Sequence, residues 1–218
     1  KKPFSIPTKG ASRQKHDTGS FSKVLVSMKN VTIKYEDTTV LDNVSWTVKS
    51  GENWAILGPN GCGKTTLLSL ITGDNPQAYA NEIYLFGQRR GSGESIWDIK
   101  RQTGIISSDL QIRYRKPITA FEVVLSGFFD SVGLYQDYTP EQKETAEQWV
   151  EILGVADKSD RVFNQLSYGE QRMQLLARSM VKVPRILILD EPCQGLDRTN
   201  RQRILDAIEI VGYQSKTN

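Results

Sequence analysis

The sequence predicts an α/β fold: a mostly parallel sheet with flanking helices, an antiparallel β part before it, and an inserted helical block. Short alternating apolar runs with short polar turns fill residues 24–52, which is typical of antiparallel strands. From residue 53 onward, apolar runs alternate with helical patterns, which is typical of a parallel sheet. Residues 112–165 show mainly helical spacing, and 218 residues are enough for one sizeable core.

In the antiparallel part, alternating apolar residues predict strands over residues 24–28 and 31–35. A polar turn over residues 36–39 leads to a third strand, which ends at residues 50–52. The residues that share one face of this third strand are Val44, Trp46 and Val48.

In the parallel part, the apolar run 53–57 predicts a buried strand, and residues 66–71 predict a helix that stops at Gly73. Further strands are predicted over residues 83–86, 104–107 and 186–190, with a loop over residues 87–94.

Helices are predicted over residues 119–128 and from Pro140 to Gly154, where Thr139 and Gln142 form a capping box. The apolar positions of a last amphipathic helix are Ile204, Ile208 and Val211.

Between the first buried strand and its helix lies a loop that fits the phosphate-binding pattern G-x-x-x-x-G-K-[ST]. Its glycines can take positive φ, so that backbone N–H groups converge on anionic oxygens beside a helix N-terminus. Lys64 is expected to reach the β and γ phosphates, and Thr65 to offer its hydroxyl to Mg²⁺. The expected nucleotide contacts are Gly58, Asn60, Gly61, Cys62, Gly63, Lys64, Thr65 and Thr66. The alternative is an ordinary glycine turn between a strand and a helix.

Two carboxylates end the strand over residues 186–190, at the edge where open α/β sheets bind ligands. Asp190 is expected to hold Mg²⁺ opposite Thr65, and Glu191 is placed to polarise an attacking water. A strand that ends in two acids is weak support by itself. Together with the phosphate-binding loop it predicts an ATPase that uses ATP and Mg²⁺.

The run Leu166-Ser167-Tyr168-Gly169-Glu170-Gln171 precedes this acidic strand. As local structure it is a capping box, in which Ser167 and Glu170 begin an amphipathic helix. A capped helix N-terminus is also an anion site.

The run also resembles L-S-x-G-[EQ], the signature of the ABC ATPases, and with the other two motifs the resemblance extends from about Val24 to the last residue. It implies that Ser167, Gly169 and Glu170 face the γ-phosphate held by a partner domain, in a head-to-tail dimer on two ATP molecules. It places Tyr35 as the residue that stacks on adenine, and Asp197 at the dimer interface. The glutamine that follows the strand over residues 104–107 is less clear: Ser108 stands there, and Gln111 is our choice as catalytic residue and Mg²⁺ ligand.

A narrower resemblance links residues 75–79, 89–98 and 125–131 to the second half of tandem ABC ATP-binding proteins of the molybdenum-transport or photorepair type. Residues 1–22 would then be a flexible linker from a first half, and residues 23–218 an ABC domain. Within this domain, residues 23–111 and 166–218 are expected to form the ATPase core and residues 112–165 a helical subdomain. A solvated loop is the alternative for residues 89–98.

Charge and cysteine content fit this interpretation. Residues 1–22 carry five basic side chains against Asp17, so the net charge of +3 leaves −1 for the rest, and no nucleic-acid partner is expected. Cys62 and Cys193 form no disulfide framework, which fits a reducing cytoplasm, with or without peripheral association at a membrane. A mitochondrial presequence, and hence the matrix, is the alternative for the basic tail. No run of 18 apolar residues exists, so no membrane-spanning helix is predicted.

The resemblance implies ATP binding and hydrolysis that power transport or another mechanical step, with a second ABC ATPase domain, tandem or identical, and a membrane permease as partners. The alternative is a non-transport tandem ABC ATPase with a regulatory, repair or translation role. A coiled-coil chromosome ATPase is disfavoured because no heptads separate Gly58 from Asp190, and a non-catalytic module because Glu191 is present.

ABC ATPases carry a switch histidine on a strand after Asp197, whereas the one histidine here is His16. We therefore expect this chain to lack that strand and to hydrolyse ATP slowly.

Overall fold

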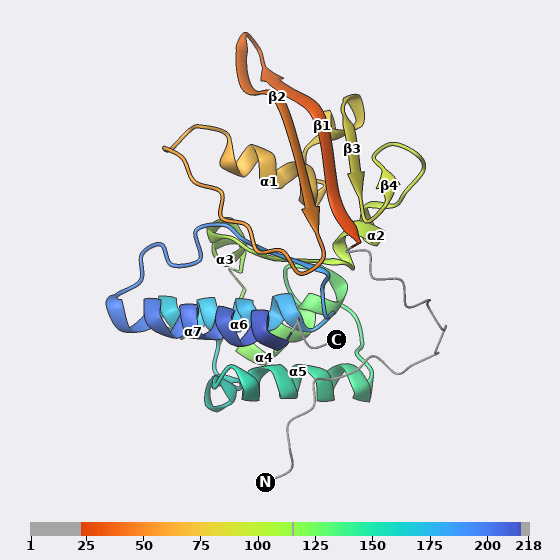
Figure 1. Ribbon diagram of the computed structural model, residues 1–218. Coiled ribbons are helices and arrows are strands. Elements are labelled where there is room, and N and C mark those ends of the chain that lie inside the picture. The colour runs from red at the N-terminus through yellow and green to blue at the C-terminus, as the bar shows by residue number, and fades with distance from the viewer. Residues whose placement is uncertain (1–22, 115, 215–218) are drawn as a thin grey trace. The chain divides into compact units, whose positions relative to one another are not determined.

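The computed structural model describes residues 23–114 and 116–214, which form two compact units. The β unit comprises residues 23–108 and Lys182–Glu191, and the helical unit comprises Asp109–Val181 and residues 192–214 (Figure 1). Both strands and helices are present, so the predicted α/β class is confirmed. The predicted tail over residues 1–22 lies outside the described residues.

A four-stranded antiparallel sheet forms one part of the β unit. Its order is β2-β1-β3-β4, with the long hairpin of β1 and β2 at one side (Figure 1). Its strands are β1 (Val24–Tyr35), β2 (Thr38–Lys49), β3 (Glu82–Leu85) and β4 (Gln88–Arg89). The two strands predicted over residues 24–35 are one continuous strand, because a register shift absorbs Asn30, whose φ is +50°.

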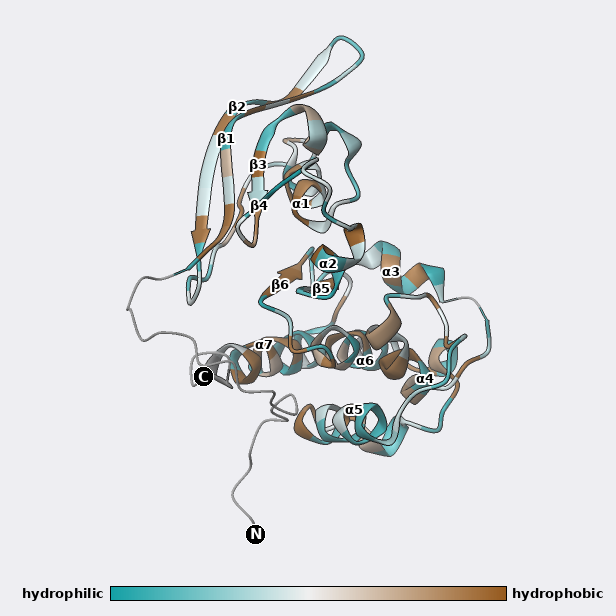
Figure 2. Ribbon diagram, turned by 90° about the vertical axis from the view of Figure 1, so that its right-hand side faces the viewer, coloured by the Kyte–Doolittle hydropathy of each residue, from teal (hydrophilic) through white to brown (hydrophobic). Residues whose placement is uncertain are grey.

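A two-stranded parallel sheet forms the other part. β5 (Thr103–Ile106) pairs in parallel with β6 (Ile186–Leu189), and the Asp190 N–H continues the ladder by donating to the Ile106 carbonyl at 2.9 Å. Figure 2 shows the apolar β6 beside β5. The prediction of parallel strands in this part of the chain is therefore confirmed for this pair. It is wrong for the strand predicted over residues 83–86, because β3 pairs antiparallel with β1.

The strand predicted over residues 53–57 is wrong. This segment has no regular structure, and Trp54 and Leu57 are 56% and 90% exposed. The Trp54 indole instead packs edge-on against Trp46 of β2, with ring centroids 5.6 Å apart, and its N–H donates to Glu52. A short apolar run becomes a strand only when a neighbouring strand pairs with it, and no pattern within the run specifies that neighbour.

Helix α1 (Lys64–Thr72) packs on the sheet through its C-terminal half, with the 3₁₀ turn η1 (Pro76–Ala80) after it. Leu70 and Ile71 share one hydrophobic core with Ile83 of β3 and Ile188 of β6. The helix ends as predicted at Gly73, which is left-handed at φ +81°. It begins at Lys64, two residues earlier than predicted.

The helical unit is built around α6 (Tyr168–Met180), which contacts α4 (Ala120–Leu125), α5 (Pro140–Ile152) and α7 (Arg198–Gln214). Its other elements are α3 (Ser108–Arg113), which begins in the β unit, and the 3₁₀ turns η2 (Ser126–Phe129), η3 (Ala156–Lys158) and η4 (Phe163–Gln165). The predicted ATPase core included residues 166–218, whereas α6 lies in the helical unit. The two divisions of the chain therefore differ, and the predicted domain boundaries stay predictions. None of the helices in the described part of the chain combines the length and the apolar character of a membrane span.

The predicted helix starts are present. Thr139 and Gln142 form the capping box of α5 with Pro140 in the first turn, and Gly154 follows its end at φ +65°. The helix predicted over residues 119–128 is α4 followed by η2, with a capping box of Thr119 and Glu122. The capping box of Thr139 and Gln142 therefore located the start of α5 correctly.

A buried arginine connects α6 to the segments around it. The Arg178 guanidinium donates to the Tyr114 hydroxyl at 2.7 Å, to the Ser126 hydroxyl at 3.3 Å and to the Ser131 carbonyl at 3.1 Å. Because buried polar groups are costly unless they are hydrogen-bonded, these contacts fix the position of Tyr114 next to α3.

The solvated loop that was the alternative for residues 89–98 is wrong for two of its charged residues. Arg90 and Glu94 form an ion pair at 2.7 Å, with side chains only 1% and 4% exposed. Glu94 also accepts the N–H groups of Gly91 and Ser92, and Arg90 donates to the Tyr79 hydroxyl. Burial raises the pKa of Glu94, but these hydrogen bonds and the Arg90 charge outweigh burial, so the pKa lies below its usual range.

We predict that Glu94→Ala destabilises the protein by about 3–5 kcal/mol, because it leaves the Arg90 charge buried and unpaired. Asp98→Ala is the matched control: its ion pair with Arg101 spans 3.5 Å between side chains 51% and 72% exposed, and we expect a loss below about 1 kcal/mol. Denaturant unfolding at pH 7 measures both. Equal losses would contradict the assignment of the buried pair.

Candidate functional site

The loop predicted to bind phosphate leads into α1 without a side-chain cap. Gly63 occupies the cap position at φ +94°, Gly61 lies at φ +83°, and no acidic residue stands in the first turn. A Cβ at Gly63 would also lie 3.0 Å from the Val40 carbonyl oxygen, so backbone geometry and space both require glycine. The first N–H groups of α1 therefore have no side-chain acceptor, and the N-terminal end of the helix favours a bound negative charge.

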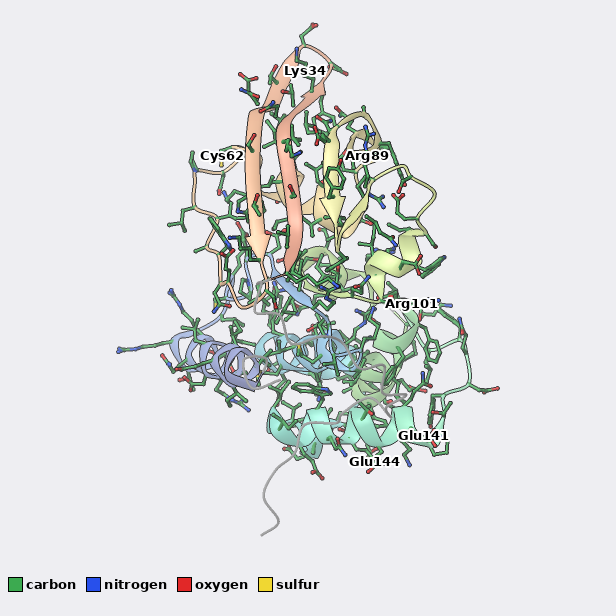
Figure 3. All side chains as sticks on the ribbon, turned by 45° about the vertical axis from the view of Figure 1, so that its right-hand side comes forward. Lys34, Cys62, Arg89, Arg101, Glu141 and Glu144 are labelled. Atoms are coloured by element: carbon green, nitrogen blue, oxygen red, sulfur yellow. The ribbon has the colours of Figure 1, made fainter. Side chains whose placement is uncertain are left out.

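Gly58 does not have the positive φ that the sequence predicted for it. A Cβ there would, however, lie 2.6 Å from the Cys62 sulfur. Cys62 itself is exposed on the loop before α1, as Figure 3 shows. The close approach of these two residues makes the loop compact.

Lys64 closes the loop in this structure. Its ammonium donates to the carbonyl oxygens of Gly58 and Pro59, both at 2.9 Å. The predicted contact of Lys64 with phosphate would exchange these neutral acceptors for charged ones, which form stronger hydrogen bonds. Asn60 and Thr65 are exposed, and Thr66 is half-buried.

The two acids follow β6 in the same unit. Asp190 is half-buried, with its N–H fixed on the β5 ladder. Glu191 is exposed at φ +50°, an uncommon conformation for a residue other than glycine, and the chain turns there. Because Ile188 of β6 shares a core with α1, one packed unit carries both the phosphate-binding loop and the acids.

Tyr35 is the last residue of β1. Its side chain is half-exposed, and its hydroxyl accepts a hydrogen bond from the Asn75 amide at 3.0 Å. A ring fixed at its hydroxyl and open on the surface is suited to stacking on a planar group.

The capping box predicted at Ser167 is confirmed. The Ser167 hydroxyl accepts the Glu170 N–H at 3.3 Å, and the Glu170 carboxylate accepts the Ser167 N–H at 2.8 Å. Hydrogen bonds from the Ser167 hydroxyl and N–H, together with nearby Lys158 and Arg161, lower the pKa of Glu170, although burial opposes this shift. Gly169 is buried in the same turn.

Gln111 lies in α3 of the helical unit, whereas the phosphate-binding loop and Asp190 lie in the β unit. Its side-chain amide donates to the Gln171 side chain at 2.7 Å, and Gln171 in turn donates to the Leu166 carbonyl. The sequence predicted Gln111 as a Mg²⁺ ligand, and this role stays a prediction. What the structure adds is that Gln111 is joined to the signature turn.

Comparison with known proteins decides the family. The family described as ABC transporter matches residues 41–194. The chain belongs to the ABC transporter family.

Curated relatives agree. ModF, an ABC transporter ATP-binding protein of Escherichia coli, is 49% identical over 88% of this chain, and the chain spans 39% of its length. A putative ABC transporter ATP-binding protein of Streptococcus mutans is 37% identical over 86% of this chain and 71% of its own. The zinc transport system ATP-binding protein TroB of Treponema pallidum is 32% identical over 88% and 70%.

Solved structures share the fold. A nucleotide-free ATP-binding cassette of an ABC transporter matches with a TM-score of 0.72 at 21% identity, over 88% of this chain and 78% of that one. As a member of this family, the chain is an ABC nucleotide-binding domain, and the function of such a domain is to bind and hydrolyse ATP.

We predict that Ser167→Ala costs about 0.5–2 kcal/mol of stability through the lost cap. Because the folded pKa of Glu170 is lowered, its contribution is present above the ordinary Glu pKa of about 4.3 and is lost as the pH falls through the folded value. The stability difference between the wild type and Glu170→Gln, measured by denaturant unfolding, should therefore shrink on acidification.

Gln142→Ala in α5 is the control, because the Gln142 side chain accepts the Thr139 N–H at 2.9 Å and carries no charge. Its cost should be the same at both ends of the pH range. A pH-independent effect of Glu170→Gln would contradict the prediction.

Proposed function

We propose that this domain binds Mg-ATP on the loop before α1 and hydrolyses it in a head-to-tail pair with a second ABC ATPase domain. The observation that carries the proposal is the uncapped start of α1, with left-handed Gly61 and Gly63 and no acid in its first turn. An uncapped helix N-terminus with converging backbone N–H groups fits the phosphate groups of a nucleotide.

The proposal gives every motif residue a role. Lys64 neutralises the β and γ phosphates, while the surrounding loop presents its N–H groups to them. The loop residues that contact phosphate are Gly58, Asn60, Gly61, Cys62, Gly63, Thr65 and Thr66. Tyr35 stacks on the adenine, where base stacking on an aromatic ring contributes about 1–3 kcal/mol.

Hydrolysis then depends on the acids at the end of β6. Thr65, Asp190 and Gln111 would hold Mg²⁺, which neutralises charge on the phosphate oxygens when it is bound. Glu191 positions the water and accepts its proton, and its exposed carboxylate is open to solvent for this task. The turn of Ser167, Gly169 and Glu170 faces the γ-phosphate held by the partner domain, and Asp197 lies at the interface.

Support for a tandem partner comes from length. The matched segment is 39% of ModF, which leaves room for a second domain of the same size. We propose that residues 23–218 correspond to the second of two such halves, and that the pair works with a membrane permease. A non-transport tandem ATPase is the competing role. Co-purification of the full-length protein with a permease from solubilised membranes would favour transport, and a fully soluble ATPase with no membrane partner would favour the other role.

We predict that Lys64→Ala abolishes Mg-ATP binding at micromolar concentrations, because it removes the charge that neutralises the phosphates. Isothermal titration calorimetry measures the affinity. Lys143→Ala, in the exposed face of α5, is the matched control and should bind ATP like the wild type. Unchanged affinity of Lys64→Ala would overturn the assignment of the loop.

We predict that Glu191→Gln in the full-length protein binds ATP but hydrolyses it about 10²–10³-fold more slowly, because the water is no longer positioned and deprotonated. The closed dimer should then accumulate in size-exclusion chromatography with ATP. Asp190→Asn should instead weaken the dependence on Mg²⁺. Glu209→Gln, on exposed α7, is the control. Wild-type turnover in both site variants would mean that another base does the work.

A further inference from the structure

The first turn of α6 and the start of α7 are in direct contact within the helical unit. Gly169 has no side chain, and the Asn200 side chain occupies the space beside it. A Cβ at Gly169 would lie 2.5 Å from Asn200 Cγ, 2.7 Å from Oδ1 and 2.9 Å from Cβ. Gly169 is not among the residues with positive φ, so close approach, and not backbone conformation, requires glycine here.

Asn200 is itself held by Asp197. One carboxylate oxygen of Asp197 accepts the Asn200 backbone N–H at 2.8 Å, and the other accepts the Asn200 side-chain amide at 2.7 Å. Hydrogen bonds from the Asn200 backbone and side chain lower the pKa of Asp197. Both oxygens of the predicted interface carboxylate therefore fix Asn200 at the beginning of α7.

A second contact joins the same two segments. Gly195 lies at φ +73°, and a Cβ there would be 3.6 Å from the Tyr168 ring. The Tyr168 ring also lies 5.3 Å from the Arg172 guanidinium, and its hydroxyl accepts a hydrogen bond from Arg172 at 3.0 Å. The turn before α7 thus lies beside Tyr168, and the first turn of α7 lies beside Gly169, so two successive residues of the signature face this segment.

We propose that Asn200 is a positioning residue: it transmits the placement of Asp197 to Gly169, and so sets where the signature turn presents its N–H groups. This inference rests on the proposed function, in which that turn faces a γ-phosphate in the partner site. Asp197 then has two tasks, one at the interface and one within its own domain. Gly169 likewise has two reasons to be glycine, of which contact with nucleotide is only one.

A double-mutant cycle on the full-length protein tests this inference. Gly169→Ala should lower kcat for ATP hydrolysis about tenfold to a hundredfold, as misplacement of a positioned group by about 1 Å does. The KM for ATP should stay within about twofold of the wild type, because the loop before α1 is untouched. Asn200→Gly removes all three atoms that the new Cβ would meet, so adding Gly169→Ala to Asn200→Gly should cost little more.

Two further variants make the cycle decisive. Gly212→Ala in α7 is the matched control, because a Cβ there meets nothing within 4 Å, and its kcat should equal that of the wild type. Asn200→Asp keeps the shape of the side chain but places a second carboxylate against Asp197. It should lower kcat with KM unchanged, and its thermal unfolding shows whether the fold is kept.

The possible results distinguish failure of the inference about Asn200 from failure of the proposed function. The inference would be overturned if Gly169→Ala lowered kcat by the same factor in the wild type and in the Asn200→Gly variant. Gly169 would then be glycine only because of its contact with nucleotide. Wild-type kcat in a folded Asn200→Asp protein would also overturn it. If Lys64→Ala still hydrolyses ATP, the proposed function fails. If Lys64→Ala is inactive and Asn200→Gly does not reduce the cost of Gly169→Ala, only the proposed role of Asn200 fails.

Discussion

The packing of α1 against the sheets is the constraint on which the β unit depends. Leu70 and Ile71 lie in one core with Ile83 of β3 and Ile188 of β6, so a single buried cluster holds the helix and both sheets. Close packing of this kind leaves little freedom to its elements. The loop at the start of α1 and the acids after β6 are therefore both attached to the same rigid core, although more than 100 residues of chain separate them.

In the helical unit, α6 has the equivalent position. Its N-terminal turn carries the box of Ser167 and Glu170 and the contact of Gln171 with Gln111, and its C-terminal half carries Arg178. The hydrogen bonds of Arg178 to Tyr114 and Ser126 are buried, and the bond between Gln111 and Gln171 is partly buried. They favour one position of α6, whereas an apolar face alone would allow it to slide. The signature turn is thus the end of a helix that is held along its length.

Local signals were sufficient for much of this description. The capping boxes at Thr139 and Ser167 and the stop at Gly73 depend on residues within a few positions of each other, and each was found where it was predicted. The family followed from three such patterns in order. The same reasoning failed for residues 53–57, because pairing of a strand depends on a partner far along the chain.

The sequence by itself therefore determined the family and most element types, because both depend on local patterns of neighbouring residues. Only the tertiary structure decided that Arg90 and Glu94 are buried together, that Gln111 bonds to Gln171, and that Asn200 fills the space beside Gly169. The last two of these contacts join residues at least 31 positions apart. The steric need for a glycine and the burial of a charged pair both depend on neighbouring residues that only the folded structure identifies.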